Sequence, residues 1–344
     1  MILEWVLKSV VIILFGLVGF AYTTYYERRW LARIQTRIGP NRAGPWGLFQ
    51  PVADGLKLIF KEELVPENAY KVAFMLAPVI TMVPAVIVMG VLPWGDLWEI
   101  PAFTLFGWDF PGYVLDLSLA NINVGVLYIL SVTSISVYGV VLAGWSSNNK
   151  YAMLGGLRST AQMISYELAL GLAFLGPVIM AGSMDIFEIV KFQQHNWWTW
   201  APSQVVGAII FFIAMIAEIN RAPFDMPEAE QELVAGYHTE YSGMKFALFF
   251  MGEYVKMVAV SAIFITLFWG GFAGPGVEAF PWLGPAYYML KVFIVLGIMI
   301  WIRGTLPRFR YDRLMAFGWK ILLPLAIFNV FLVAVISFAR FGSA

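Results

Sequence analysis

The sequence predicts an all-α polytopic membrane protein with about eight transmembrane helices. Only 13% of its 344 residues are charged and 60% are hydrophobic, whereas a soluble domain carries about 25% charged residues. Eight apolar segments each approach the roughly 20 residues that a helix needs to cross a bilayer. No linker or internal repeat divides the chain, so we expect a single transmembrane domain over residues 1–344.

The expected spans follow one another along the whole chain. The first span is followed by Glu27-Arg28-Arg29 and not by a small-residue cleavage site. We therefore expect an uncleaved helix rather than a signal peptide. The spans lie at about 5–26, 72–94, 117–143, 158–180, 203–219, 245–270, 286–303 and 319–339.

The distribution of Lys and Arg predicts the orientation of these spans. Stretch 27–71 carries eight basic residues and stretch 303–320 carries five, whereas 95–116 carries none and has four acidic residues. Because loops on the cytoplasmic side are enriched in Lys and Arg, we expect both termini outside. The loops after the first, third, fifth and seventh spans then lie inside.

The stretch "WGLFQPVADGLKLIFKEE" predicts an interfacial amphipathic helix over about 46–63. Its apolar residues follow helical spacing, and Pro51 suits a first helical turn. The segment is too short and too charged to span, so it should lie in the membrane interface. It could rest on lipid headgroups or form one wall of a cavity for a lipid-soluble ligand. Upstream, Arg37 and Arg42 in "RIGPNRAGPWG" could dock a partner or bind an anion.

The composition excludes several kinds of redox chemistry in this chain. With no cysteine there is no disulfide, no thiolate nucleophile and no cysteine-ligated iron–sulfur cluster. The two histidines, His195 and His238, lie in different loops, which disfavours bis-histidine haem ligation. The D-x-D-x-D-G and H-E-x-x-H metal motifs are absent. We expect no flavin, haem, iron–sulfur cluster or metal in this chain.

Ionisable residues within the spans are candidates for function, because they are costly in lipid and mark pathways or pairs. Glu167 has no basic partner in its own span, and a polar stripe of Ser159, Gln162 and Tyr166 lies nearby. Glu253 and Lys256 are spaced i, i+3, which allows a mutual ion pair.

The stretch "EINRAPFDMPEAEQELVAGYHTEYSG", residues 218–243, concentrates six acidic residues in a very apolar chain. Glu218 ends the fifth span, where the helix dipole disfavours a second negative charge, so it is a candidate for holding a proton. Asp225 as N-cap and Glu228 in a capping-box position predict a short acidic loop helix that Gly236 can close. These acids could share protons as a coupled set. Alternatively, they only cap a helix and face water.

Two long motifs resemble a known family. "YYERRWLARIQTRIGPNRAGPWGLFQPVADGLKLIFKE" and "AEINRAPFDMPEAEQELVAGYHTEYSGMKFALFFMGEY" are similar to the two signature regions of one membrane-subunit family of NADH:quinone oxidoreductase, respiratory complex I. The family comprises the bacterial H subunit and its mitochondrial counterpart, called subunit 1. The resemblance covers essentially the whole chain. It implies a quinone substrate bound at an interface with soluble iron–sulfur subunits, neighbouring antiporter-like membrane subunits, contact with membrane lipid and no nucleic acid.

The resemblance also implies residue roles, none of them catalytic in the covalent sense. It implies a quinone channel lined by Arg28, Arg37, Asp54, Phe60, Arg221, Phe224 and Asp225. It implies an acidic proton path through Glu167, Glu218, Glu228, Glu232 and Glu253; Glu230 and Glu240 belong to the same motif, and the intramembrane Lys256 joins the candidates.

Two other functions stay open at this point. The chain could be the equivalent subunit of a ferredoxin-fed dehydrogenase or a membrane-bound hydrogenase. It could also be a stand-alone proton or cation antiporter that uses Glu167, Glu253 and Lys256, although the lack of duplicated broken helices disfavours this. We expect a bacterial plasma membrane location, with the mitochondrial inner membrane as the alternative. The choice between ubiquinone and menaquinone is open.

Overall fold

The computed structural model describes residues 2–100, 103–105, 108–110, 112–225, 235–277 and 280–341. Within them, eight helices are long and apolar enough to cross a membrane, which confirms the predicted all-α polytopic fold. These helices are α1 (Ile2–Ile34), α3 (Lys71–Val91), α4 (Gly125–Ser146), α5 (Lys150–Ala181), α7 (Trp197–Glu218), α9 (Gly243–Phe268), α10 (Leu283–Thr305) and the continuous pair α11 (Tyr311–Phe317) and α12 (Leu323–Phe341).

Several helix ends differ from the predicted ends for local reasons. Helix α1 continues to Ile34, because its Arg, Leu and Glu residues favour a helix beyond the apolar run. Helix α5 begins eight residues early at Lys150, where the Asn149 side chain accepts a hydrogen bond from the Tyr151 amide at 2.9 Å. Helix α4 begins late, because Asp116 forms a local turn with the amide of Ser118.

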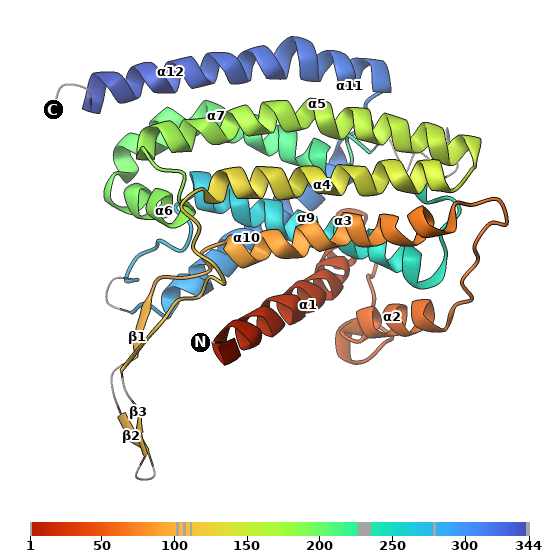
Figure 1. The fold of residues 1–344 in the computed structure, drawn as a ribbon, viewed down its shortest axis with the longest axis horizontal. Helices are drawn as coiled ribbons and strands as arrows, with labels where there is room; N and C mark the ends of the chain where they lie inside the picture. Colours follow the sequence, from red (N-terminus) through yellow and green to blue (C-terminus); the bar gives the residue numbers. More distant parts are fainter. Residues whose placement is uncertain are drawn as a thin grey trace.

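The predicted interfacial helix is present as α2 (Gln50–Phe60), preceded by the 3-10 turn η1 (Pro45–Gly47). Pro51 lies in its first turn, as predicted, and none of its residues is buried. The helix is shorter than the predicted 46–63, because the backbone at Lys61 is extended. It packs beside α1 and α9 at one end of the molecule (Figure 1).

Helix α9 is the centre of the bundle and packs against α1, α3, α7 and α10. Figure 1 shows the long helices running side by side, with both termini at one end and α2 and α11 at the other. The sequence did not predict helix α6 (Ile186–His195) or the antiparallel pairs β1 (Trp98–Ile100) with β4 (Tyr113–Leu115) and β2 (Phe103–Leu105) with β3 (Trp108–Phe110). These elements lie toward the end that holds the termini. Which end is outside stays a prediction.

Two glycines allow close backbone approach in this bundle. A Cβ at Gly139 would lie 2.8 Å from the Ala77 carbonyl, so α3 and α4 pack tightly here. A Cβ at Gly155 would lie 2.6 Å from the Cα of Gly236, which starts the 3-10 turn η2 (Gly236–His238). The predicted acidic loop helix with Glu228, Glu230 and Glu232 lies outside the described residues, but the two ends of its loop are fixed against α5.

Candidate functional site

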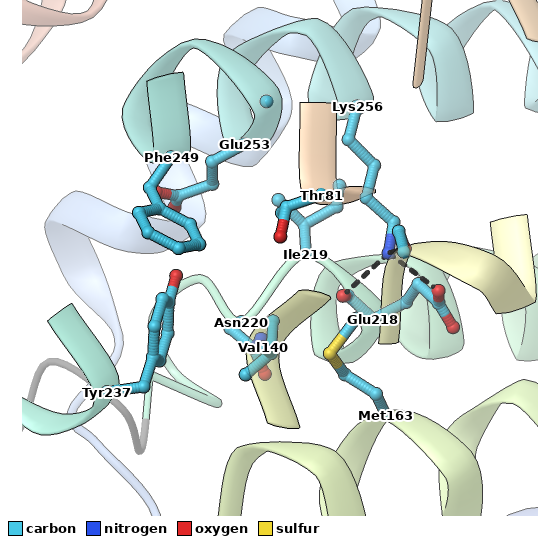
Figure 2. Close-up of a pocket in the computed structure, with 12 residues that line it drawn as sticks. Thr81, Val140, Met163, Glu218, Ile219, Asn220, Tyr237, Phe249, Glu253 and Lys256 are labelled. Carbon is cyan, nitrogen blue, oxygen red and sulfur yellow. Dashed lines mark hydrogen bonds and ion pairs between the residues drawn. The ribbon is translucent and has the colours of Figure 1, made fainter. Parts of the chain in front are cut away.

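A buried ion pair lies in the interior of the bundle. Lys256 of α9 contacts Glu218, the last residue of α7, at 2.8 Å, and both side chains are more than 90% buried. Lys256 also donates to the hydroxyl of Ser136 of α4 at 3.2 Å. Figure 2 shows Lys256 directed at both the carboxylate and the backbone carbonyl of Glu218. The pair offsets the large cost of burying either charge alone.

A small polar cavity adjoins this pair. It has a volume of about 30 Å³, and its lining includes Glu218, Asn220, Glu253, Tyr237 and Lys256 (Figure 2). This volume holds one or two water molecules. The Oε2 atom of Glu218 is buried and has no hydrogen-bond partner among the described residues. A buried carboxylate oxygen of this kind favours a hydrogen-bond partner, and Glu218 also lines this cavity.

A second group of buried charges surrounds Arg221. Its guanidinium contacts Glu253 of α9 at 2.6 Å and Glu27 of α1 at 3.3 Å. Glu27 also pairs with Arg303 of α10. The Arg221 guanidinium lies over the ring of Tyr254, 4.3 Å from its centre. Arg221 thereby connects α1, α9 and, through Glu27, α10.

The mutual pair of Glu253 and Lys256 that the spacing allows is not the arrangement found. Glu253 reaches Arg221, and Lys256 reaches Glu218. The two partners lie three residues apart, at the end of α7 and just after it. The α9 residues therefore belong to a buried charge series instead of one local pair. This series consists of Glu27, Arg303, Arg221, Glu253, Glu218 and Lys256.

Glu167 of α5 is half-buried and accepts a hydrogen bond from Ser134 of α4. Ser134 and Ser136 are two residues apart on α4, and Ser136 contacts Lys256. The polar residues that precede Glu167 on α5 have structural partners. Gln162 donates to the carbonyls of Ala217 and Phe224, Tyr166 donates to that of Leu314, and Ser159 accepts from Asn220. The polar stripe therefore fixes the chain around Glu218.

A mostly apolar cavity of about 300 Å³ lies between α1, α2 and α9. Its polar lining includes Arg28 of α1 and Asp54 of α2, which form an ion pair at 2.5 Å. Gln50 donates to the other oxygen of Asp54 at 3.1 Å. Tyr254 also lines the cavity, and its ring is in contact with the Arg221 guanidinium. The apolar cavity and the buried charges thus share one residue.

The structure separates the residues predicted to line a quinone channel. Arg28 and Asp54 line the cavity together, whereas Arg221 does not line it but contacts the lining residue Tyr254. Arg37 bonds to Gln35 at the surface. Phe60 is 85% exposed and is not among the lining residues of this cavity.

The last two predicted channel residues lie on another side of the Arg221 loop. Phe224 stacks on Phe309 with ring centres 5.7 Å apart, and Asp225 pairs with Arg308 at 3.0 Å. They therefore connect the loop to the segment between α10 and α11.

Comparison with known proteins identifies the family. The profile of a family described as NADH dehydrogenase matches residues 7–334. The chain belongs to this family. It is 51% identical over 314 residues to the H subunit of the NADH-quinone oxidoreductase of Protochlamydia amoebophila, covering 91% of each chain. It is 49% identical over 336 residues to the H subunit numbered 1 of the NADH-quinone oxidoreductase of Geobacter sulfurreducens, covering 97% of this chain and 95% of the relative.

Sequence reasoning missed three charged residues that this family member places in the site. Glu27 and Arg303 pair beside Arg221, and Arg308 pairs with Asp225. From the sequence, Glu27 was interpreted only as a residue flanking the first span, and Arg303 and Arg308 only as part of a basic loop. Their position in the sequence could have indicated this role. Glu27 and Arg303 lie where expected spans end, and a charged side chain there can face the bundle interior as well as the solvent.

The remaining predicted residue, Glu240, lies near His238 at the end of the acidic loop. Glu240 accepts a hydrogen bond from Asn149 at 2.5 Å and thus anchors the loop to the start of α5. His238 lies among aromatic rings, including Tyr237, Phe246 and Phe250. Burial lowers the pKa of His238 to about 4, so it is neutral at physiological pH.

We expect the segment around His238 to lose stability in mild acid. An opened segment binds a proton as pH falls below about 6.5, whereas the closed segment does not until about pH 4. At pH 5 the free energy of local opening should therefore fall by about 2 kcal/mol. Hydrogen exchange of a peptide spanning 235–243, corrected for intrinsic rates, measures this change. His238→Phe, which suits the aromatic surroundings, should remove the dependence; an equal loss in that variant would contradict this assignment.

Proposed function

We propose that this chain is the quinone-binding and proton-coupling membrane subunit of an NADH:quinone oxidoreductase. The relatives that match nearly the whole chain carry that enzyme's name. The observation that carries the proposal is the juxtaposition of an apolar cavity and a buried charge series. Tyr254 lines the cavity and contacts Arg221, Arg221 pairs with Glu253, and Glu253 shares the small polar cavity with Glu218 and Lys256.

The cavity between α1, α2 and α9 suits a molecule with an apolar tail and a polar head. Its volume is about 300 Å³ and its walls are mostly apolar, with the Arg28 and Asp54 pair as a local polar group. Pockets with a few polar groups in apolar walls orient such ligands. Phe60, at the exposed end of α2, would then act at a partner interface rather than in this cavity. Phe224 is buried against Phe309 and lies outside this cavity.

Reduction of a quinone takes two electrons and two protons. The electrons must come from partner subunits, because this chain has no cysteine to hold an iron–sulfur cluster. The chain's own part is to bind the quinone and to respond to the change in charge. A new negative charge in the cavity would attract the Arg221 guanidinium and weaken its ion pair with Glu253. Glu253 would then bind a proton more readily, and the Glu218 and Lys256 pair, which lines the same small cavity, would respond to that change.

The partners and location belong to the same proposal. Soluble iron–sulfur subunits would cover the end that carries α2 and the acidic loop, with that end on the inside. Antiporter-like membrane subunits would lie beside the bundle and receive the change through Glu167. The membrane would be a bacterial plasma membrane.

Native purification through a tag on this chain tests the proposal. We expect iron–sulfur and antiporter-like subunits to co-purify, and the assembly to reduce quinone with NADH in a reaction that a quinone-site inhibitor blocks. A chain that purifies alone and exchanges cations for protons would contradict it. An assembly that uses ferredoxin or hydrogen instead of NADH would assign the chain to a related complex.

We expect Asp54→Asn to weaken quinone binding with little change in kcat. The variant removes the charge that holds Arg28, and a hydrogen bond of this kind contributes about 1 kcal/mol, so the KM for quinone should rise about fivefold. Arg33→Gln serves as the control, because it removes an exposed charge from α1, the helix that carries Arg28. Steady-state kinetics of the purified assembly measure both. An unchanged KM in Asp54→Asn would remove this pair from the quinone site.

A further inference from the structure

A second and larger cavity lies away from the charge series. It has a volume of about 530 Å³ and lies between α7, the end of α10, α11 and the π-helical turn η3 (Gly318–Leu322). Its lining is apolar apart from Arg313 and Lys320. Leu306 and Ile321 in its wall are half-exposed, so the cavity opens at the outer surface of the bundle. In a membrane-spanning chain, lipid reaches such a surface wherever no partner subunit covers it.

The two basic residues of this cavity have no ion-pair partner among the described residues. Arg313 and Lys320 are both exposed and are seven residues apart, on α11 and η3. Neighbouring charges are already neutralised, since Arg308 pairs with Asp225 and Arg310 with Asp312. The cavity thus combines an apolar interior with two positive charges at the end of the bundle that carries the basic loops.

The walls of the cavity are held in place by polar contacts. Tyr166 of α5 donates to the Leu314 carbonyl at 2.9 Å, and the Trp319 indole donates to Ser165 at 3.1 Å. The π turn carries Lys320 and Ile321 into the lining, and single π turns within helices frequently mark functional sites. The opening is therefore a fixed feature of the fold.

We propose that this cavity binds one anionic phospholipid, with an acyl chain in the apolar interior and the phosphate between Arg313 and Lys320. Basic pockets between transmembrane helices on the side with excess Lys and Arg attract anionic headgroups. A transmembrane helix is about 10 Å across and needs a groove along its whole length, whereas this cavity is lined only by residues near one end of α7, α10 and α11. A neutral quinone gains nothing from two cations, which have no ion-pair partner in the described part of the chain.

The bound lipid also supports the loop that carries Arg221. Pro223 and Phe224 form part of the cavity wall, and the Phe309 amide donates to the Pro223 carbonyl at 3.1 Å. An acyl chain in the cavity would pack against these residues and hold the loop in position. The lipid site itself does not depend on what occupies the cavity between α1, α2 and α9.

Photolabelling of the intact purified assembly in nanodiscs tests this site. The probe is a phosphatidylglycerol with a photoreactive group in its acyl chain. The labelled peptides are identified by mass spectrometry, with unlabelled phosphatidylglycerol or phosphatidylcholine as competitor. We expect labelling within 212–216 and 302–321, competed by phosphatidylglycerol and not by phosphatidylcholine. Arg313→Gln/Lys320→Gln should lower it at least about fivefold, since each cation near a membrane surface contributes about that factor.

Two further variants separate the site from general effects. Ala316→Phe places a ring in the cavity and keeps both charges, so it should also lower labelling. Lys71→Gln/Lys150→Gln removes two exposed charges from the starts of α3 and α5 and should leave labelling unchanged. Equal labelling in Arg313→Gln/Lys320→Gln or in Ala316→Phe would overturn the proposal. So would equal competition by phosphatidylcholine, or a cross-link that places a partner subunit in the cavity.

Discussion

Replacing Arg221 by Gln should cause the largest loss of function among the single substitutions considered. Arg221 contacts Glu253 at 2.6 Å, Glu27 at 3.3 Å and the Tyr254 ring, and its side chain is only 9% exposed. Gln keeps a polar group but removes the charge that two buried carboxylates share. Removing one partner of a buried ion pair costs about 3–5 kcal/mol. Quinone reduction by the assembly should fall by tenfold or more, for which about 1.4 kcal/mol suffices.

Two control variants define what this loss means. Arg221→Lys keeps the charge but not the planar group over Tyr254, so it should recover only part of the activity. Arg310→Gln breaks an exposed pair with Asp312 and should change activity and stability little, because exposed pairs contribute about 0–1 kcal/mol. The measurements are quinone reductase rate and the amount of assembled complex. An Arg221→Gln variant with wild-type rate would exclude Arg221 from the coupling path.

The second large effect concerns the buried pair of Glu218 and Lys256. Glu218→Gln leaves Lys256 without its carboxylate partner, and Lys256→Met leaves Glu218 without its cation, so each single variant should be less stable than the wild type. Neither variant keeps the two opposite charges of the wild-type pair. We therefore expect quinone reduction coupled to proton transfer to fall by about tenfold or more in both, equivalent to about 1.4 kcal/mol.

The double variant Glu218→Gln/Lys256→Met separates stability from coupling. Replacing a whole buried pair by neutral groups is often neutral for stability, so the double variant should be as stable as the wild type or more stable than either single variant. Its coupled activity should stay low. Glu188→Gln, an exposed acid on α6 at the other end of the bundle, is the matched control. Recovery of coupled activity along with stability would make the pair purely structural.

The membrane spans were predictable from the sequence because the length of an apolar segment is a local property. Eight spans and the helix with Pro51 in its first turn were found in this way. Helix α6 was not, because its ten residues are too few for a span and its apolar face packs on α9 and α5.

The site was only partly predictable, because charge partners depend on packing between distant segments. Spacing suggested that Glu253 and Lys256 pair with each other, whereas their partners are Arg221 and Glu218. Glu27 meets Arg221 across 194 residues of sequence. No local rule gives such a pair from one sequence. The resemblance to a known family supplied candidate residues, but it did not separate Arg28 and Asp54, which share a cavity, from Phe224 and Asp225, which do not.

The most direct test of the central claim records quinone reduction and proton transfer together in vesicles that contain the Glu218→Gln/Lys256→Met assembly. NADH oxidation by an artificial acceptor that needs no quinone reports on the intact electron-input subunits. If the buried charge series couples the quinone cavity to the bundle, the artificial activity and assembly should be normal while quinone reduction and proton transfer both fall. Wild-type rates of both processes in this variant would contradict the account.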